Sequence, residues 1–95
     1  MTKHESKLVH ECCMIARSKG LAAVRLEKTG NKGVPDYIFI KEGGQTLFVE
    51  FKRPDGRGVV SAEQRYWSKF LGYSHYFINN ADEFEQLIKI YFGEG

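Results

Sequence analysis

Two adjacent glycines near the middle of the chain constrain its fold more than any other feature. Gly43 and Gly44 separate two β-prone runs, Tyr37–Ile40 and Thr46–Phe51. Glycine readily takes the positive φ that tight hairpin turns require, so the two runs predict an antiparallel hairpin. If the hairpin turns at Gly43, the numbers of facing positions sum to about 86. That register places Asp36 opposite Glu50, to within one step.

The remaining elements follow from hydrophobic periodicity and from capping residues. Helical spacing predicts a first helix that Gly20 ends, and two later helices that Ser61 and Asn80 cap. Alternating residues predict strands before the hairpin and between the later helices. The predicted segments are helix Ser6–Lys19, strand Ala22–Glu27 with Val24 and Leu26 inward, the hairpin strands, a helix from Ser61 to Gly72, strand Tyr73–Ile78 and a closing helix after Asn80. The order α-β-β-β-α-β-α predicts an α/β fold in which helices flank a mixed central β-sheet, within a single domain of residues 1–95.

Composition narrows the class of protein without naming a function. A chain of 95 residues, 42% hydrophobic and 27% charged, is typical of a folded domain rather than a disordered segment. The adjacent Cys12 and Cys13 lack metal-ligand spacing and are read as thiols. No apolar stretch resembles a signal peptide or membrane span, which predicts an intracellular, cytoplasmic protein without a membrane partner. The net charge of +2 is too small to indicate nucleic-acid binding by itself.

The predicted hairpin brings two carboxylates and an amine together. Strand alternation puts Lys52 on the same side as Glu50, and Asp36 faces that glutamate across the hairpin. Two carboxylates about 4 Å apart repel by about 4 kcal/mol in a protein surface environment, which favours a bound cation. Oxygen ligands suit Mg²⁺ or Mn²⁺, and the main-chain carbonyl of Phe51 is a candidate additional ligand. Lys52 would then stabilise a phosphate or assist an attacking water.

Two further side chains are candidates for this site. The apolar face of the first helix is centred near Glu5, which is therefore the predicted inward acid, whereas Glu11 lies about 100° away and is the alternative. Gln64 stands three residues after Ser61 and fits a capping box, in which its amide returns to the backbone of the capping residue. A role of Gln64 in the site and its role in the cap are compatible.

The residues that carry this chemistry resemble those of a known family. The run Gly33–Asp36, then Phe48–Lys52, then Gln64, resembles the VRR-NUC family, a branch of the PD-(D/E)XK nucleases, over nearly the whole chain. The resemblance implies a restriction-endonuclease-like core, metal binding by Asp36 and Glu50, and catalytic roles for Lys52, Glu5 and Gln64. It further implies a bacterial or phage-encoded endonuclease that acts on duplex or branched DNA in replication, repair or recombination, Holliday junctions and flaps included, and that pairs as a homodimer.

Basic residues around the predicted loops are candidates for contact with DNA phosphates. They are Lys28, Lys32, Arg53, Arg57 and Arg65. The aromatic residues Tyr66, Trp67 and Phe70 are assigned to the core or to a dimer contact. Two other functions stay open: a non-catalytic nucleic-acid or protein-interaction module, and a restriction-like enzyme specific for a short sequence. No sequence feature assigns base readout, so the latter ranks lower.

Overall fold

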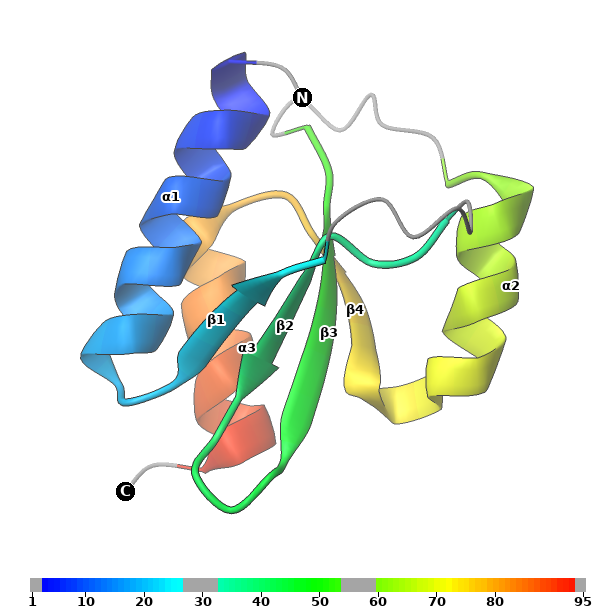
Figure 1. The fold of residues 1–95 in the computed structure, drawn as a ribbon. Coiled ribbons are helices and arrows are strands. Elements are labelled where there is room, and N and C mark those ends of the chain that lie inside the picture. Colours follow the sequence, from blue (N-terminus) through cyan, green and yellow to red (C-terminus); the bar gives the residue numbers. More distant parts are fainter. Residues whose placement is uncertain (1–2, 27–32, 54–59, 94–95) are drawn as a thin grey trace.

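A computed structural model of the chain describes residues 3–26, 33–53 and 60–93, apart from the side chains of residues 3–5 (Figure 1). These residues form three α-helices, four strands and one 3-10 turn. The elements are α1 (Lys3–Ser18), β1 (Ala22–Arg25), β2 (Tyr37–Ile40), β3 (Thr46–Phe51), α2 (Ala62–Leu71), η1 (Gly72–Ser74), β4 (His75–Ile78) and α3 (Ala81–Phe92). Their order confirms the predicted order of helices and strands.

The four strands form one mixed sheet in the order β1-β2-β3-β4. β1, β2 and β3 pair antiparallel, and β4 pairs parallel with β3. In the central hairpin Tyr37 pairs with Val49 and Ile38 with Phe48, which is the predicted register. Gly43 and Gly44 form its turn with φ of 104° and 105°, values that other residues rarely adopt.

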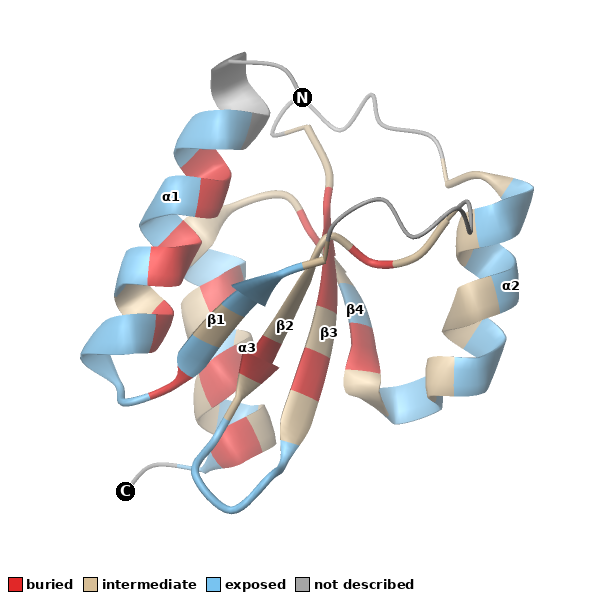
Figure 2. Cartoon of the chain, in the orientation of Figure 1, coloured by how far each residue is buried: buried red, intermediate tan, exposed pale blue. Residues whose placement is uncertain are grey.

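One face of the sheet carries the core. α1 and α3 contact each other and cover this face, and the buried segments of both helices lie on the side that faces the sheet (Figure 2). The largest fully buried side chains are Phe39, Phe84, Leu47, Ile88, Val49 and Cys12. Phe39 and Phe84 lie with ring centroids 4.9 Å apart, so the sheet and α3 meet through aromatic packing. Both cysteines are buried as free thiols, and burial raises the pKa of Cys12 to about 12.

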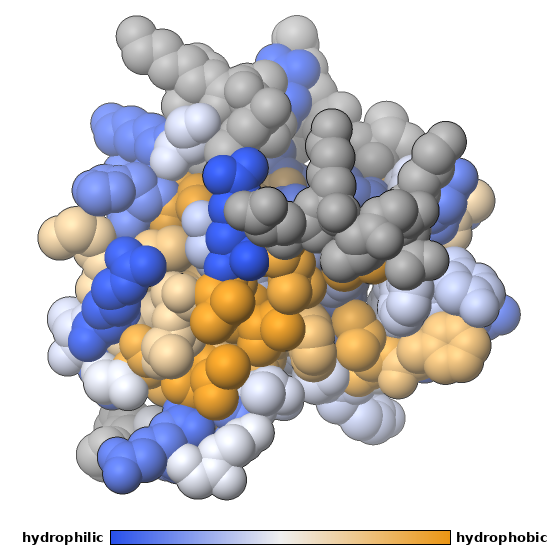
Figure 3. All heavy atoms as spheres, viewed as in Figure 1, coloured by the Kyte–Doolittle hydropathy of each residue, from blue (hydrophilic) through white to orange (hydrophobic). Residues whose placement is uncertain are grey.

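The opposite face of the sheet is covered much less. α2 lies at the β4 side of this face and has no buried residue (Figures 1 and 2). Strand alternation places Ile38, Ile40 and Phe48 on this face, where all three are half-buried. Apolar side chains gather over the same strands in the space-filling view (Figure 3). Among the described residues, an apolar sheet surface therefore remains open beside α2.

Several predictions about single elements are wrong in detail. The first helix begins at Lys3 rather than Ser6, and the last strand begins at His75 because Gly72–Ser74 form a 3-10 turn. β1 ends at Arg25, and its Ala23 packs toward the core whereas Val24 is 43% exposed. The register explains why Ala23 rather than Val24 faces the core, because Ala23 lies opposite the buried Phe39. Of the two places predicted for the aromatic residues of α2, the core is wrong, because Tyr66 is 56% and Phe70 70% exposed and α2 has no buried residue; the dimer contact stays a prediction.

Candidate active site

The central hairpin holds Asp36 beside Glu50. Asp36 directly precedes β2, and continuing the observed register by one step sets it opposite Glu50 of β3. The backbone N–H of Phe51 donates to Oδ2 of Asp36 over 3.0 Å, and the N–H of Leu26 donates to the Asp36 carbonyl over 2.9 Å. These bonds fix both the backbone and the carboxylate of Asp36 at the end of the sheet.

Gln64 joins the second carboxylate to the lysine. Its Nε2 donates to Oε1 of Glu50 over 2.9 Å, and its Oε1 accepts from Nζ of Lys52 over 2.7 Å. The ammonium group of Lys52 also lies 5.6 Å from the centre of the Phe77 ring. Glu50, Lys52 and Gln64 therefore share one hydrogen-bonded cluster, as the strand alternation predicted for the first two.

Glu50 is buried in a way that disfavours its negative charge. The residue is only 7% exposed, and its Oε2 atom receives no hydrogen bond from the described residues. Burial, followed by the charge of Asp36 and a hydrogen-bonding contact with it, raises the pKa of Glu50 to about 8, whereas Lys52 and Gln64 act in the opposite direction. A proton or a cation at Oε2 would relieve this cost.

The donor set fits a hard divalent cation. Mg²⁺ is commonly held by one or two carboxylates, with waters and substrate phosphate oxygens completing its octahedral shell. Asp36 and the buried, unsatisfied Oε2 of Glu50 supply such a pair. Within residues 3–26, 33–53 and 60–93, no group of three or more His, Cys, Asp or Glu side chains is placed to hold a metal. The described site therefore fits a cation that takes its remaining ligands from water and substrate.

The other predicted site residues fall into three groups. Glu5 lies in the first turn of α1, but its side chain lies outside the described part of the chain, as do Lys28, Lys32 and Arg57. Glu11 is exposed, as predicted. Arg53 is half-buried next to Lys52, and Arg65 is exposed beside Gln64. The two described arginines thus follow directly on residues of the cluster.

Sequence reasoning missed the structural role of Gly33. The sequence singles it out only as the start of the motif run Gly33–Asp36, whereas in the structure it has φ of 84° and packs against the first turn of α2. A Cβ atom added at Gly33 would lie 2.4 Å from the backbone carbon of Glu63 and 2.6 Å from the backbone nitrogen of Gln64. Only glycine permits this approach. The segment before Asp36 is thereby pressed against the helix turn that bears Gln64.

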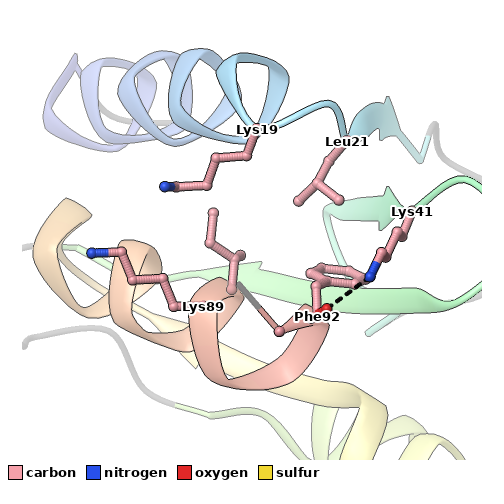
Figure 4. A pocket seen from close by; sticks show the side chains of 7 residues that line it. Lys19, Leu21, Lys41, Lys89 and Phe92 are labelled. Carbon is pink, nitrogen blue, oxygen red and sulfur yellow. Dashed lines mark hydrogen bonds between the residues drawn. The ribbon is translucent and has the colours of Figure 1, made fainter. Parts of the chain in front are cut away.

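A separate hollow of about 310 Å³ lies at the other end of the sheet, next to Lys41, which follows β2 (Figure 4). Its lining residues are Lys19, Leu21, Lys41, Ile88, Lys89, Phe92 and Gly93. Nζ of Lys41 donates to the carbonyl of Phe92 over 2.9 Å, and Lys89 pairs with Glu85. Lysines at helix C-termini complement the negative end of the helix dipole, so these charges have a structural explanation. The hollow lacks the carboxylates of the hairpin site.

Comparison with solved structures identifies the architecture. A structure described as "VRR_NUC domain" superposes with a TM-score of 0.81 over 95% of this chain and 99% of that chain, at 19% sequence identity. The fold is that of a VRR_NUC domain. No protein-family model and no curated protein matches the chain. The predicted fold class is thereby confirmed, and the predicted resemblance is confirmed at the level of the fold.

The VRR_NUC fold gives the cluster its place in the molecule. Asp36 and Glu50 lie where the central hairpin opens, and Gln64 reaches them from the first turn of α2. The site thus draws on two strands and one helix that the fold brings together. None of the described helices has the length and apolar character needed to cross a bilayer.

Proposed function

We propose that this chain is a Mg²⁺- or Mn²⁺-dependent endonuclease that hydrolyses DNA phosphodiester bonds. The observation that carries the proposal is the cluster of Asp36, Glu50, Lys52 and Gln64 on a VRR_NUC fold, in which one buried carboxylate oxygen has no hydrogen-bond donor. Such an arrangement combines an acid pair suited to a hard cation with a neighbouring amine. Together these are the groups that phosphoryl transfer requires.

Each residue of the cluster would have a defined part in hydrolysis. When bound, the cation supplies Lewis-acid stabilisation of charge on the phosphate and favours ionisation of water. Asp36 and Glu50 would hold it, with the carbonyl of Phe51 as a further candidate ligand. The Lys52 ammonium would contact a phosphate oxygen or the attacking water. Gln64 keeps Lys52 within reach of Glu50 by bonding to both residues. The acidic residue Glu5 on α1 remains a candidate for the same site.

Basic residues beside the cluster would bind the DNA backbone. Arg53 and Arg65 adjoin Lys52 and Gln64 in the chain, and the proposal adds Lys28, Lys32 and Arg57 from the segments outside the described residues. Contacts to phosphate supply affinity that does not depend on sequence and that falls as salt rises. This predicts an enzyme that selects the shape of DNA, such as a flap or a four-way junction, rather than a base sequence. Its place would be the cytoplasm, in replication, repair or recombination.

We also propose that two copies of the chain pair through the open apolar surface. Half-buried Ile38 and Phe48 lie on the sheet, and the exposed Phe70 and Tyr73 lie on α2 and η1. Tyr73 is 94% exposed, and an aromatic surface of this kind gains stability when a partner covers it. A four-way junction presents two strands for symmetrical cutting, which a two-fold dimer with two sites would match.

A cleavage assay tests the proposed activity. Labelled duplex, flap and four-way-junction DNA are incubated with the protein and Mg²⁺, Mn²⁺ or a chelator. We expect cleavage in the presence of either cation, fastest on a branched substrate, and none with the chelator. Intact DNA of every form under every condition would refute the enzyme and favour a non-catalytic binding module. Discrete fragments from plasmid DNA would instead indicate a sequence-specific enzyme.

A further inference from the structure

Ser61 stands immediately before α2 and beside the candidate active site. We propose that Ser61 is a positioning residue, which sets the orientation of the Gln64 amide and through it decides which oxygen of Glu50 is left for a cation. The inference rests on the proposed function, because it names the residue that organises the same site. It depends on four structural observations.

Ser61 and Gln64 hold each other by two reciprocal hydrogen bonds. The backbone N–H of Gln64 donates to Oγ of Ser61 over 3.1 Å, and the backbone N–H of Ser61 donates to Oε1 of Gln64 over 3.1 Å. This is the capping box that the sequence predicted. Both the backbone and the side chain of Gln64 are therefore tied to Ser61.

The second bond determines which way the amide of Gln64 faces. The N–H of Ser61 and the ammonium of Lys52 can only donate, so the oxygen end of the amide must lie toward them. A rotated amide would set its NH₂ group against two donors. The nitrogen end consequently lies toward Glu50, where it donates to Oε1 over 2.9 Å.

The oriented amide makes the two carboxylate oxygens of Glu50 inequivalent. Oε1 is occupied by the Gln64 amide, whereas Oε2 is buried and receives no hydrogen bond from the described residues. A buried carboxylate oxygen without a donor is costly unless a cation or proton meets it. The cap at Ser61 thus leaves one defined oxygen of Glu50 available to a divalent ion.

The rest of α2 does little to hold this arrangement. None of its residues is buried. α3 provides the contrast, because Asn80 caps it with a similar bond to the backbone of Glu83 while Phe84 and Ile88 anchor it in the core. Loss of the Ser61 hydroxyl removes the bond that holds the Gln64 backbone N–H at Ser61. The Gln64 amide should then leave the Ser61 N–H more readily than loss of the Asn80 cap disturbs its own helix.

The test compares wild-type protein with Ser61→Ala, Ser61→Thr and Asn80→Ala. Three quantities are measured: Mn²⁺ affinity by calorimetry, exchange of the Gln64 side-chain amide protons by NMR in metal-free protein, and the thermal midpoint. We expect Ser61→Ala to weaken Mn²⁺ binding by about tenfold, in the range found for groups that orient metal ligands, and to speed exchange of the Gln64 amide. Ser61→Thr keeps the hydroxyl, so its Mn²⁺ affinity and Gln64 amide exchange should equal those of the wild type. Asn80→Ala should lower the thermal midpoint without changing the Mn²⁺ affinity or the Gln64 amide exchange.

The outcomes separate this inference from the proposed function. Mn²⁺ binding by Ser61→Ala that equals that of the wild type, with unchanged Gln64 exchange, would overturn the positioning role even if the wild type cuts DNA. Equal loss of affinity in Asn80→Ala would also overturn it, because the effect would then be general destabilisation. If the wild type binds no Mn²⁺, the proposed function fails and the inference about the cation fails with it.

Discussion

Single residues in this chain carry costs that folding alone does not explain. Glu50 is buried beside Asp36, and its Oε2 atom lacks a hydrogen-bond donor among the described residues. Burying such a group destabilises the native state unless another interaction offsets the loss of water. The proposed cation, held by both carboxylates, would offset this cost. Lys52, which the Gln64 amide holds, would act on the substrate phosphate.

The role of Lys52 can be measured by substitution. Replacing Lys52 with alanine removes one positive group near the phosphate, and we expect cleavage to slow by about 100- to 1,000-fold, the usual cost of losing one such group. Lys69→Ala is the matched control, because this exposed lysine lies in the last turn of α2. Single-turnover cleavage rates compare the variants. A Lys52→Ala protein that cuts at the wild-type rate would refute the assigned role.

His75 predicts a pH dependence of stability. The residue is 7% exposed, both ring nitrogens lack hydrogen-bond partners among the described residues, and burial lowers its pKa below the usual 6.5. The unfolded chain therefore takes up a proton first, and the free energy of unfolding should fall as pH drops through 6.5. Thermal midpoints between pH 7.5 and 5 for wild type and His75→Leu measure the effect. We expect the thermal midpoint of His75→Leu to fall less than that of the wild type as the pH drops. Parallel curves for the two proteins would contradict this prediction.

At the level of elements, the hairpin was predictable and its surroundings were less so. Turn glycines and alternating residues determine the register locally, and the observed pairs match the predicted ones. The Ser61 cap was predictable for the same reason. Which side chains of β1 face the core was not predictable, because the placement of Ala23 depends on its partner Phe39 across the sheet. Nor does local sequence reveal that α2 buries none of its aromatic residues, since that depends on which helices cover which face.

The contact between Gly33 and α2 predicts an unequal pair of glycine substitutions. Gly20 and Gly33 have nearly the same φ, 81° and 84°, but an added Cβ meets nothing at Gly20 and meets the α2 backbone at Gly33. The positive φ should destabilise both alanine variants. The free energy of unfolding of Gly33→Ala should fall by about 1–3 kcal/mol more than that of Gly20→Ala because of the clash. Urea denaturation measures the free energies of unfolding. Equal losses would show that the close approach does not matter.

At the level of the whole molecule, α1 and α3 cover one face of the sheet, whereas α2 lies at the β4 side of the other face (Figure 1). The candidate catalytic residues lie at one end of that second face, beside the apolar surface of the sheet and α2. Pairing of two chains there would bury aromatic side chains and bring two sites into one particle. The oligomeric state therefore bears on both stability and substrate choice.

The proposed pairing surface is tested by placing a charge on it. Phe70→Lys alters a residue that is 70% exposed on α2, and Ile90→Lys alters one that is 81% exposed on α3. We expect the wild type and Ile90→Lys to sediment as dimers and Phe70→Lys as a monomer, since an unpaired charge at an apolar contact disfavours association. Sedimentation velocity distinguishes these states. A monomeric wild type would contradict the proposal, as would a dimeric Phe70→Lys.

Cleavage by an Asp36→Asn variant tests the central claim most directly. The substitution keeps the size of the side chain and a carbonyl oxygen able to accept the Phe51 N–H, but it removes the charge of one carboxylate. With Mg²⁺ present, the wild type is predicted to cut labelled four-way-junction DNA and the folded variant to leave it intact. Cutting by Asp36→Asn at the wild-type rate would show that the hairpin carboxylates are not the site of hydrolysis.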